Sequence, residues 1–358
     1  MKSANINFGV VGLGRISDKH LSALKANEIE VKFICDLDYQ KFNNFDNPSL
    51  IKTADYRDLY NYSEIINAVS ICSDSESHTS IASEILTNGF HCLIEKPVSL
   101  NLNEIDNLLV LARSRGLKVS ICHQNRFNLP VQKLKRSIKD EKLGKLFYGV
   151  ATIRWNRNEG YYSQAYWRGK WKSDGGALMN QSIHNIDLLI WMMGSPVIEV
   201  FGYIDNKNHP SIEVEDMGVA LLKFANGSLG IIESSMNTYP ENFEETLSIF
   251  GEKGTVVLGG KSVNKIVHWN VKDDPIDDLD AFNEEVDSIY GNGHIALYRD
   301  FIEAIREDRE PAITLQDGRN AVEVILAIYK SSFEKRPISL PLPPETSTIM
   351  FEGKSFND

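Results

Sequence analysis

Residues 5–36 read NINFGVVGLGRISDKHLSALKANEIEVKFICD, and this stretch decides the fold of the chain. A short apolar run is followed by a glycine turn, an amphipathic segment, a second apolar run and one acidic residue. We therefore predict a strand, a loop, a helix and a second strand that ends at Asp36. Gly12, Gly14 and Ser17 have the spacing of a dinucleotide-binding fingerprint, GxGxxS, in which the last position is usually Gly or Ala.

The glycine turn predicts a binding site for the pyrophosphate of a dinucleotide. Gly12 would permit the tight turn, and Gly14 would let the backbone approach a pyrophosphate at the N-terminus of the next helix, where N–H groups carry partial positive charge. We expect Arg15 and Ile16, the next residues of the same loop, to line the cofactor as well. The alternative is a glycine turn in some other doubly wound protein.

Asp36 indicates which dinucleotide binds. A carboxylate at the end of the second strand accepts hydrogen bonds from an adenosine ribose diol and repels the extra phosphate of NADP. Leu37 and Asp38 follow it and place no positive charge beside it. We therefore predict NAD in preference to NADP.

Length and composition narrow the class of protein. A chain of 358 residues exceeds one typical domain, so two domains are expected. The net charge of −11 argues against non-specific binding to nucleic acid or to an anionic membrane, because both require a basic face. We find no signal peptide and no apolar run of transmembrane length, and we expect a cytoplasmic protein. The four cysteines lack metal-site spacing, so we expect buried thiols and no metal.

Strands and helices alternate up to Cys122, which predicts a parallel sheet covered by helices on both faces. Ligands bind at the carboxyl ends of such strands. The polar residues at or just past these ends are candidate cofactor contacts: Ser73, His78, Glu95, Lys96 and Gln124. We place an NAD-binding Rossmann domain at residues 1–124.

From Asn125 onward the pattern changes to several extended segments joined by glycine turns, with one long helix predicted over 178–193. This pattern is typical of an α+β domain with an open, mostly antiparallel sheet. We assign residues 125–358 to this second domain, which would bind the substrate and form the oligomer.

Two short stretches carry the groups expected to react. Lys96 follows a strand directly, and a positively charged nicotinamide beside it would disfavour its ammonium form, so that the amine could relay a proton. Asn180, His184 and Asp187 are spaced four and three apart, along one stripe of the predicted helix. His184 could take a hydroxyl proton near neutral pH, and Asn180 could orient it or the substrate. Alternatively, Lys96 is a surface lysine and His184 is simply paired with Asp187.

Residues 155–172 concentrate cations and aromatic rings around a single carboxylate, Glu159. In so acidic a chain, this local excess of positive charge predicts an anion-binding segment, in which arginines bind carboxylate or phosphate and rings stack on a sugar or base. The alternative is an arm that merely packs. We assign three of its residues to the substrate, Arg157, Tyr161 and Tyr162, and two to the cofactor, Trp167 and Arg168.

With these residues in hand, the chain resembles the glucose–fructose oxidoreductase/inositol dehydrogenase (Gfo/Idh/MocA) family over nearly its whole length. The matching motifs are the glycine turn, Glu95-Lys96-Pro97, the helix with His184, and a closing helix with Tyr329 and Ser331. The resemblance implies a Rossmann domain, a second domain with an open sheet, a homodimer or homotetramer built on that sheet, and catalytic roles for Lys96 and His184.

Within the family, the chain is similar to the bacterial UDP-N-acetylglucosaminuronate 3-dehydrogenases. The similarity covers residues 124–126, 161–162, 167–169, 174–176, 179–181, 213–216 and 251–256. It implies substrate contacts by Asn125, Arg126 and Gln181, in addition to those above. Many family members have Asp where this chain has Asn180; the uronate-oxidising branch has Asn there too, which leaves Asn180 a positioning role.

The reaction that this resemblance implies is oxidation of the carbon 3 hydroxyl of a nucleotide-linked sugar in surface polysaccharide biosynthesis. Hydride passes to NAD while His184 or Lys96 removes the hydroxyl proton. Some relatives regenerate bound NAD with 2-oxoglutarate. Three alternatives stay open: an NAD-dependent dehydrogenase of a free sugar, an inositol or a different nucleotide sugar; a glycoside hydrolase that oxidises carbon 3 transiently; and a non-catalytic NAD-binding regulator.

Overall fold

A computed structural model describes residues 6–356, and its contacts divide the chain into two compact units. Within the described residues, unit 1 comprises 6–122 and 294–319, and unit 2 comprises 123–293 and 320–356. The sequence had assigned all of 125–358 to the second domain, whereas His294–Arg319 packs within unit 1. Residues 1–5 and 357–358, with which the two predicted domains begin and end, lie outside the described residues.

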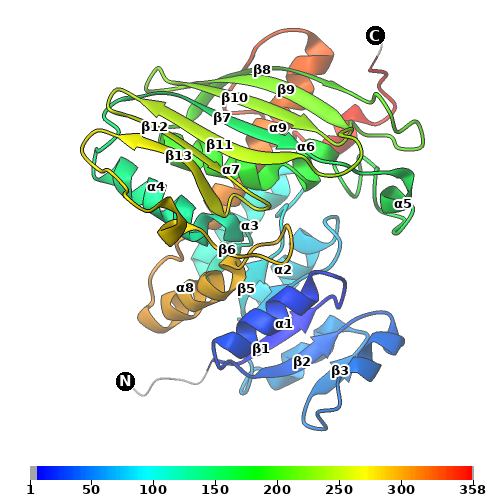
Figure 1. Ribbon diagram of the computed structural model, residues 1–358. Helices are drawn as coiled ribbons and strands as arrows, with labels where there is room; N and C mark the ends of the chain where they lie inside the picture. The colour runs from blue at the N-terminus through cyan, green and yellow to red at the C-terminus, as the bar shows by residue number, and fades with distance from the viewer. Residues whose placement is uncertain (1–5, 357–358) are drawn as a thin grey trace. The chain divides into compact units, whose positions relative to one another are not determined.

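Unit 1 is a parallel six-stranded sheet with helices packed on it (Figure 1). The strand order is β3-β2-β1-β4-β5-β6, the order of a doubly wound nucleotide-binding fold. The strands are β1 (Phe8–Val11), β2 (Val31–Cys35), β3 (Ile51–Thr53), β4 (Ala68–Ile71), β5 (His91–Ile94) and β6 (Val119–Ile121). The helices are α1 (Ser17–Ala26), α2 (His78–Thr87), α3 (Leu102–Arg115) and α8 (Gly293–Glu307), of which α8 belongs to this unit from His294.

Unit 2 is built on an eight-stranded sheet of order β13-β12-β11-β7-β10-β9-β8-β14, in which only the central pair β7 and β10 is parallel. The strands are β7 (Leu146–Arg154), β8 (Val197–Asp205), β9 (Met217–Phe224), β10 (Leu229–Ser235), β11 (Glu244–Gly251), β12 (Gly254–Gly259), β13 (Lys265–Val271) and β14 (Ile338–Ser339). The helices are α4 (Leu129–Lys139), α5 (Glu159–Tyr162), α6 (Ala177–Asn180), α7 (Ile183–Met193) and α9 (Leu315–Glu334), and α9 begins in unit 1. The predicted fold class is confirmed.

The two faces of the unit 2 sheet differ. Burial alternates along β9, β10 and β11, as period-2 side-chain placement requires. One face is buried, and α7 packs on it against β7 and β11 (Figure 1). The opposite face exposes Tyr203, Leu221 and Leu229, each more than half accessible.

The helix predicted over 178–193 is in fact two helices. Gln181 and Ser182 separate α6 from α7, and the Ser182 hydroxyl is 2.6 Å from that of Ser234 on β10. A serine side chain that bonds elsewhere favours a helix start over a helix interior. Asn180 and His184 therefore do not share one continuous helical stripe.

All four cysteines are buried, and none is in a disulfide. Across the residues that the structure describes, we find no helix with the length and apolar character needed to cross a bilayer.

Candidate active site

The glycine turn in unit 1 has the geometry that a close cofactor approach requires. Gly12 has a φ of +92°, and a Cβ there would lie 2.6 Å from the backbone carbon of Cys72, so only glycine fits. A Cβ on Gly14 would meet nothing within 4 Å, which leaves room for a ligand. The Ser17 hydroxyl donates to the carbonyl of Gly14 at 2.7 Å, which fixes the start of α1. Arg15 and Ile16 lie between them, and Arg15 is exposed.

Asp36 lies just past β2 and is bound by the glycine loop. Its carboxylate accepts hydrogen bonds from the N–H groups of Leu13 at 2.7 Å and Asp38 at 2.9 Å, and from Lys41 Nζ at 2.9 Å. Burial would raise the pKa of this carboxyl, but the Lys41 and backbone donors outweigh it and hold the pKa low. The expectation that no positive charge lies beside Asp36 was wrong, because the turn after β2 returns Lys41 to it.

We expect Asp36→Asn to weaken NAD binding by about tenfold. The affinities for NAD and NADP should then be closer to each other than in the wild type. One hydrogen bond to a charged acceptor is worth about 1.5–3 kcal/mol, and about 1.4 kcal/mol corresponds to tenfold. Titration calorimetry with both dinucleotides measures the change. Lys41→Met, which keeps the carboxylate, should retain the preference for NAD. An unchanged NAD/NADP affinity ratio in Asp36→Asn would show that this carboxylate does not select the cofactor.

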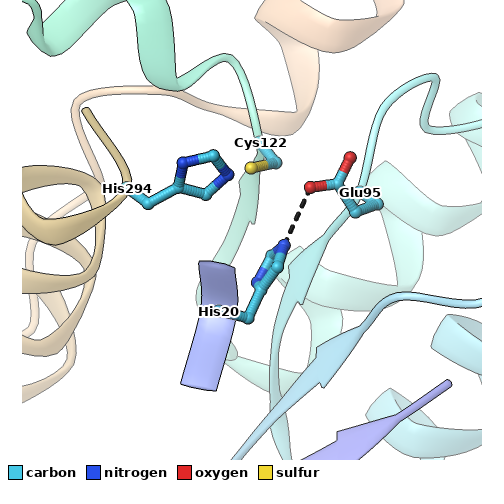
Figure 2. A group of neighbouring side chains, drawn as sticks. All are labelled: His20, Glu95, Cys122 and His294. Carbon is cyan, nitrogen blue, oxygen red and sulfur yellow. Dashed lines mark hydrogen bonds and ion pairs between the residues drawn. The ribbon is translucent and has the colours of Figure 1, made fainter. Parts of the chain in front are cut away.

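The other predicted residues of unit 1 gather at the ends of β4 and β5. The buried ring of His78 lies 3.1 Å from the carbonyl of Ser73 and 2.8 Å from that of Pro97. Burial is the main reason that its pKa is lowered. His78 therefore joins the loop after β4 to the turn that carries Lys96, whose side chain is half-buried. The carboxylate of Glu95 is buried, 2.8 Å from His20 Nε2, and it accepts the N–H of Lys96 at 3.1 Å (Figure 2).

In unit 2, residues 124–126 form a short 3-10 turn, η3 (Gln124–Phe127), and are almost completely buried. The Arg126 guanidinium donates from Nε and Nη2 to the two carboxylate oxygens of Asp187, at 2.7 and 2.6 Å, and lies over the Trp191 ring. Both carboxylate oxygens of Asp187 therefore bind Arg126. Asp187 therefore has a partner in Arg126, and the predicted substrate contact of Arg126 gains no support from this arrangement.

The predicted catalytic residues of unit 2 lie around the break between α6 and α7. The Asn180 amide donates to Asp174 at 2.5 Å, and the Gln181 amide donates to the Tyr161 hydroxyl at 2.9 Å. The half-buried His184 ring stands edge-on to the ring of His123, with centroids 5.7 Å apart. Sequence reasoning missed His123, although it lies two residues past the end of β6, where functional side chains were expected.

The cationic aromatic segment folds around Tyr161. The guanidinium groups of Arg157 and Arg168 lie 5.0 and 4.0 Å from the centroid of the Tyr161 ring, and Arg168 also lies over Trp167 at 5.3 Å. Tyr162 points away into the core, where its ring packs on His209. Tyr161 also binds Gln181, which lies in the break between α6 and α7. Through Tyr161, the segment therefore holds two guanidinium groups close to this break.

A buried glutamate, Glu215, holds the start of α6 in place. Glu215 Oε1 accepts the N–H of Leu178 at 2.8 Å and the hydroxyl of Tyr329 at 2.9 Å, and burial raises the pKa of Glu215 well above its usual value. Gly176 has a φ of +104°, and a Cβ there would lie 1.8 Å from Glu215 Oε2. The carboxyl group of Glu215 therefore requires glycine at position 176, directly before α6.

A cavity of about 430 Å³ opens beside β11, β12 and β13 in unit 2. Trp155, Asn242, Glu245, Lys261 and Ile289 are among its lining residues. Glu245 is only 3% exposed, and burial raises its pKa to about 8, although Asn185 and Arg157 act in the opposite direction. The volume is in the range of small-molecule sites.

We expect Glu245→Gln to change how stability depends on pH. The folded protein keeps the Glu245 proton up to about pH 8, whereas the unfolded chain releases it near 4.5, so the stabilisation that Glu245 contributes is lost as pH rises between these values. By about pH 7 the loss is about 3 kcal/mol. Urea denaturation from about pH 5 to pH 8 should show that the free energy of unfolding of Glu245→Gln rises relative to that of the wild type. The same dependence of this free energy on pH in both proteins would contradict the prediction.

Residues 6–123 match the oxidoreductase family's NAD-binding Rossmann fold, and residues 135–340 match the C-terminal alpha/beta domain of the same family, GFO_IDH_MocA. The chain belongs to the Gfo/Idh/MocA oxidoreductase family. The resemblance drawn from the sequence is confirmed, and the protein is an NAD-dependent dehydrogenase of the class that acts on a CH–OH group.

Two solved relatives extend the match. The chain is 32% identical to the WlbA dehydrogenase of Bordetella pertussis, solved in complex with NADH and UDP-GlcNAcA; the match covers 95% of this chain and 100% of that one, with a TM-score of 0.84. It is 31% identical to the WlbA dehydrogenase of Chromobacterium violaceum, in complex with the same two ligands, over 96% and 98% of the chains, with a TM-score of 0.86. The myo-inositol 2-dehydrogenase of Thermotoga maritima is 25% identical, over 94% of this chain and 98% of that protein.

Proposed function

We propose that this family member oxidises the carbon 3 hydroxyl of UDP-N-acetylglucosaminuronate to the ketone, with NAD as hydride acceptor, in the biosynthesis of a surface polysaccharide. The observation that carries the proposal is the likeness, above 30% identity over nearly the whole chain, to two dehydrogenases solved with NADH and UDP-GlcNAcA. The unit 2 site supports it. Arg157, which is assigned to the substrate, places a cation over the Tyr161 ring, which suits a substrate with a diphosphate and a carboxylate.

We assign roles to the reacting residues as part of this proposal. The substrate loses a proton from its hydroxyl and a hydride from carbon 3, and NAD accepts the hydride. Lys96 and His184 are the groups that accept or relay the proton. Asn180 positions the reactants, because an amide does not titrate and its orientation is set by Asp174 at 2.5 Å.

The cofactor-binding residues are proposed on the same basis. Gly12, Gly14, Arg15 and Ile16 would hold the pyrophosphate, and Asp36 the ribose. Ser73, His78, Gln124, Trp167 and Arg168 stay as proposed contacts. The structure changes the proposal for Glu95: its buried carboxylate binds His20 and the Lys96 backbone, so it would act through the position of Lys96.

The proposal is tested by incubating purified protein with UDP-N-acetylglucosaminuronate and 2-oxoglutarate. We expect 2-hydroxyglutarate if the enzyme recycles bound NAD in place, or reduction of added NAD if it does not. If neither product forms, the substrate assignment fails.

A second candidate function is dehydrogenation of a free inositol or sugar. The 25% identity to the Thermotoga maritima myo-inositol 2-dehydrogenase over most of both chains favours it. A panel of inositols, free sugars and UDP-sugars separates the two candidates. Arg157→Gln, at the arginine assigned to the substrate, should raise the KM of a UDP-sugar and leave that of a neutral sugar unchanged.

We also propose that the protein is a homodimer or homotetramer, formed through the exposed face of the unit 2 sheet. Tyr203, Leu221 and Leu229 on that face are 55%, 57% and 53% exposed, and such apolar faces are usually covered by a partner. Native mass spectrometry of freshly purified protein would report the subunit count and bound NAD together.

A further inference from the structure

Four metal-ligating side chains from distant parts of the chain meet inside unit 1. His20 comes from α1, Glu95 from the end of β5, Cys122 from the end of β6 and His294 from the start of α8 (Figure 2). One ligand atom of each lies within 4.8 Å of the corresponding atoms of the others. Their exposed fractions are 0%, 6%, 0% and 3%, so all four are removed from water.

His294 is the member that the packing does not explain. Neither of its ring nitrogens has a hydrogen-bond partner among the described residues, although the ring is buried. A buried polar group without a partner costs about 1–3 kcal/mol, and such a group in a native fold requires an explanation.

The ion pair between His20 and Glu95 explains the burial of only these two of the four side chains. His20 Nε2 lies 2.8 Å from Glu95 Oε1. This contact gives both His20 and Glu95 a partner without a metal ion. It gives no reason for a second imidazole with two unpaired nitrogens to be buried beside it, next to a thiol.

We propose that His20, Glu95, Cys122 and His294 form a closed structural site for a divalent metal ion of the zinc type. Two imidazoles, a thiolate and a carboxylate are ligands that zinc accepts, and four protein ligands without an open position are typical of structural zinc. The thiolate and the carboxylate together neutralise the charge of the ion, so the filled site is neutral in its buried environment. Binding displaces the thiol proton and the proton shared by His20 and Glu95.

The surroundings and the spacing fit this proposal. His20 Nδ1 lies 2.7 Å from the Tyr298 hydroxyl, which lies 2.6 Å from that of Ser70, so His20 would present Nε2 to the ion with its other nitrogen held. Ligand bonds of about 2.0–2.3 Å place tetrahedral ligand atoms about 3.3–3.8 Å apart. Ligand atoms up to 4.8 Å apart would therefore close by about 1 Å around the ion, while the His20–Glu95 pair, now 2.8 Å apart, would open. Glu95 also accepts the N–H of Lys96, so the site would brace the turn that carries Lys96.

The experiment is to produce the full chain in cobalt-supplemented medium, because so buried a site fills during folding. We expect about one Co²⁺ per chain after gel filtration, with the absorption bands of tetrahedral thiolate ligation. Cys122→Ser should lose the thiolate-to-cobalt band. The matched control Cys92→Ser, a buried thiol outside the cluster, should keep it.

The wild-type protein decides the question by itself if a variant does not fold. Less than about one-tenth of an equivalent of cobalt, and likewise of zinc from zinc-supplemented medium, in wild-type protein that binds NAD would overturn the proposal. Stoichiometric cobalt without a thiolate band, or with a band that Cys122→Ser retains, would also overturn it.

Discussion

Replacing Arg126 by methionine is expected to lower the free energy of unfolding by about 3–5 kcal/mol, because it leaves a buried carboxylate without its cation. The Arg126 and Asp187 side chains are 4% and 2% exposed, and two short hydrogen bonds join them. Asp187 lies on α7, one turn from His184, so the same change should disturb the orientation of the proposed catalytic histidine.

Urea denaturation without NAD measures this loss. The double variant Arg126→Met/Asp187→Leu should recover most of it, since replacing a buried ion pair by apolar residues is often nearly neutral. Arg57→Met is the matched surface control: Arg57 also binds a carboxylate through two nitrogens, on Glu84, but is 54% exposed. If Arg126→Met and Arg57→Met cause equal, small losses, the buried pair does not stabilise unit 2.

Lys96→Met and His184→Gln are each expected to lower kcat by about 10²–10⁴-fold, the usual contribution of a positioned proton-transfer group. Neither replacement accepts a proton near neutral pH, and each keeps much of the shape of the original side chain. In His184→Gln, NAD affinity should change by less than about threefold, since His184 is not among the proposed cofactor contacts. Single-turnover NADH formation together with NAD titration separates the two effects.

His268→Gln provides the control, because His268 lies exposed on β13, and it should retain wild-type turnover. Full turnover in Lys96→Met or in His184→Gln would remove that residue from the proposed chemistry. Loss in only one of them would identify the principal base.

The sequence predicted the parts of the fold whose patterns are local. The strands of unit 1 are short apolar runs followed by polar residues, so β1, β2, β4, β5 and β6 were all found. The glycine turn was equally clear, and the φ of +92° at Gly12 agrees with the role assigned to it. In unit 2 the alternation along β9 and β10 was sufficient to find both strands.

The misses depend on contacts between residues that are distant in the sequence. The break at Ser182 depends on Ser234, 52 residues away, and Lys41 reaches Asp36 only because the chain turns back after β2. β13 was missed because only Ile266 and Val271 in it are buried, so it lacks a regular alternation. The sequence placed His294–Arg319 in the second domain because no pattern shows that α8 packs in unit 1.

The same limit applied to the candidate sites. Lys96, His184 and the cationic segment could be singled out because each has a motif or a charge pattern of its own. The cluster of His20, Glu95, Cys122 and His294 could not, because its members span more than two hundred residues without metal-site spacing. Glu245 was missed for a similar reason: its burial depends on neighbouring segments, and a carboxyl in an alternating strand is usually exposed.

In the proposed reaction, hydride leaves carbon 3 of the nucleotide-linked uronate and passes to NAD. The most direct measurement uses UDP-N-acetylglucosaminuronate carrying deuterium at carbon 3, with mass spectrometry of the nicotinamide cofactor and of any 2-hydroxyglutarate formed. We expect one deuterium in the reduced cofactor, or in 2-hydroxyglutarate if the cofactor is recycled. Turnover that leaves the deuterium on the sugar or releases it to water would exclude hydride transfer from carbon 3 to NAD.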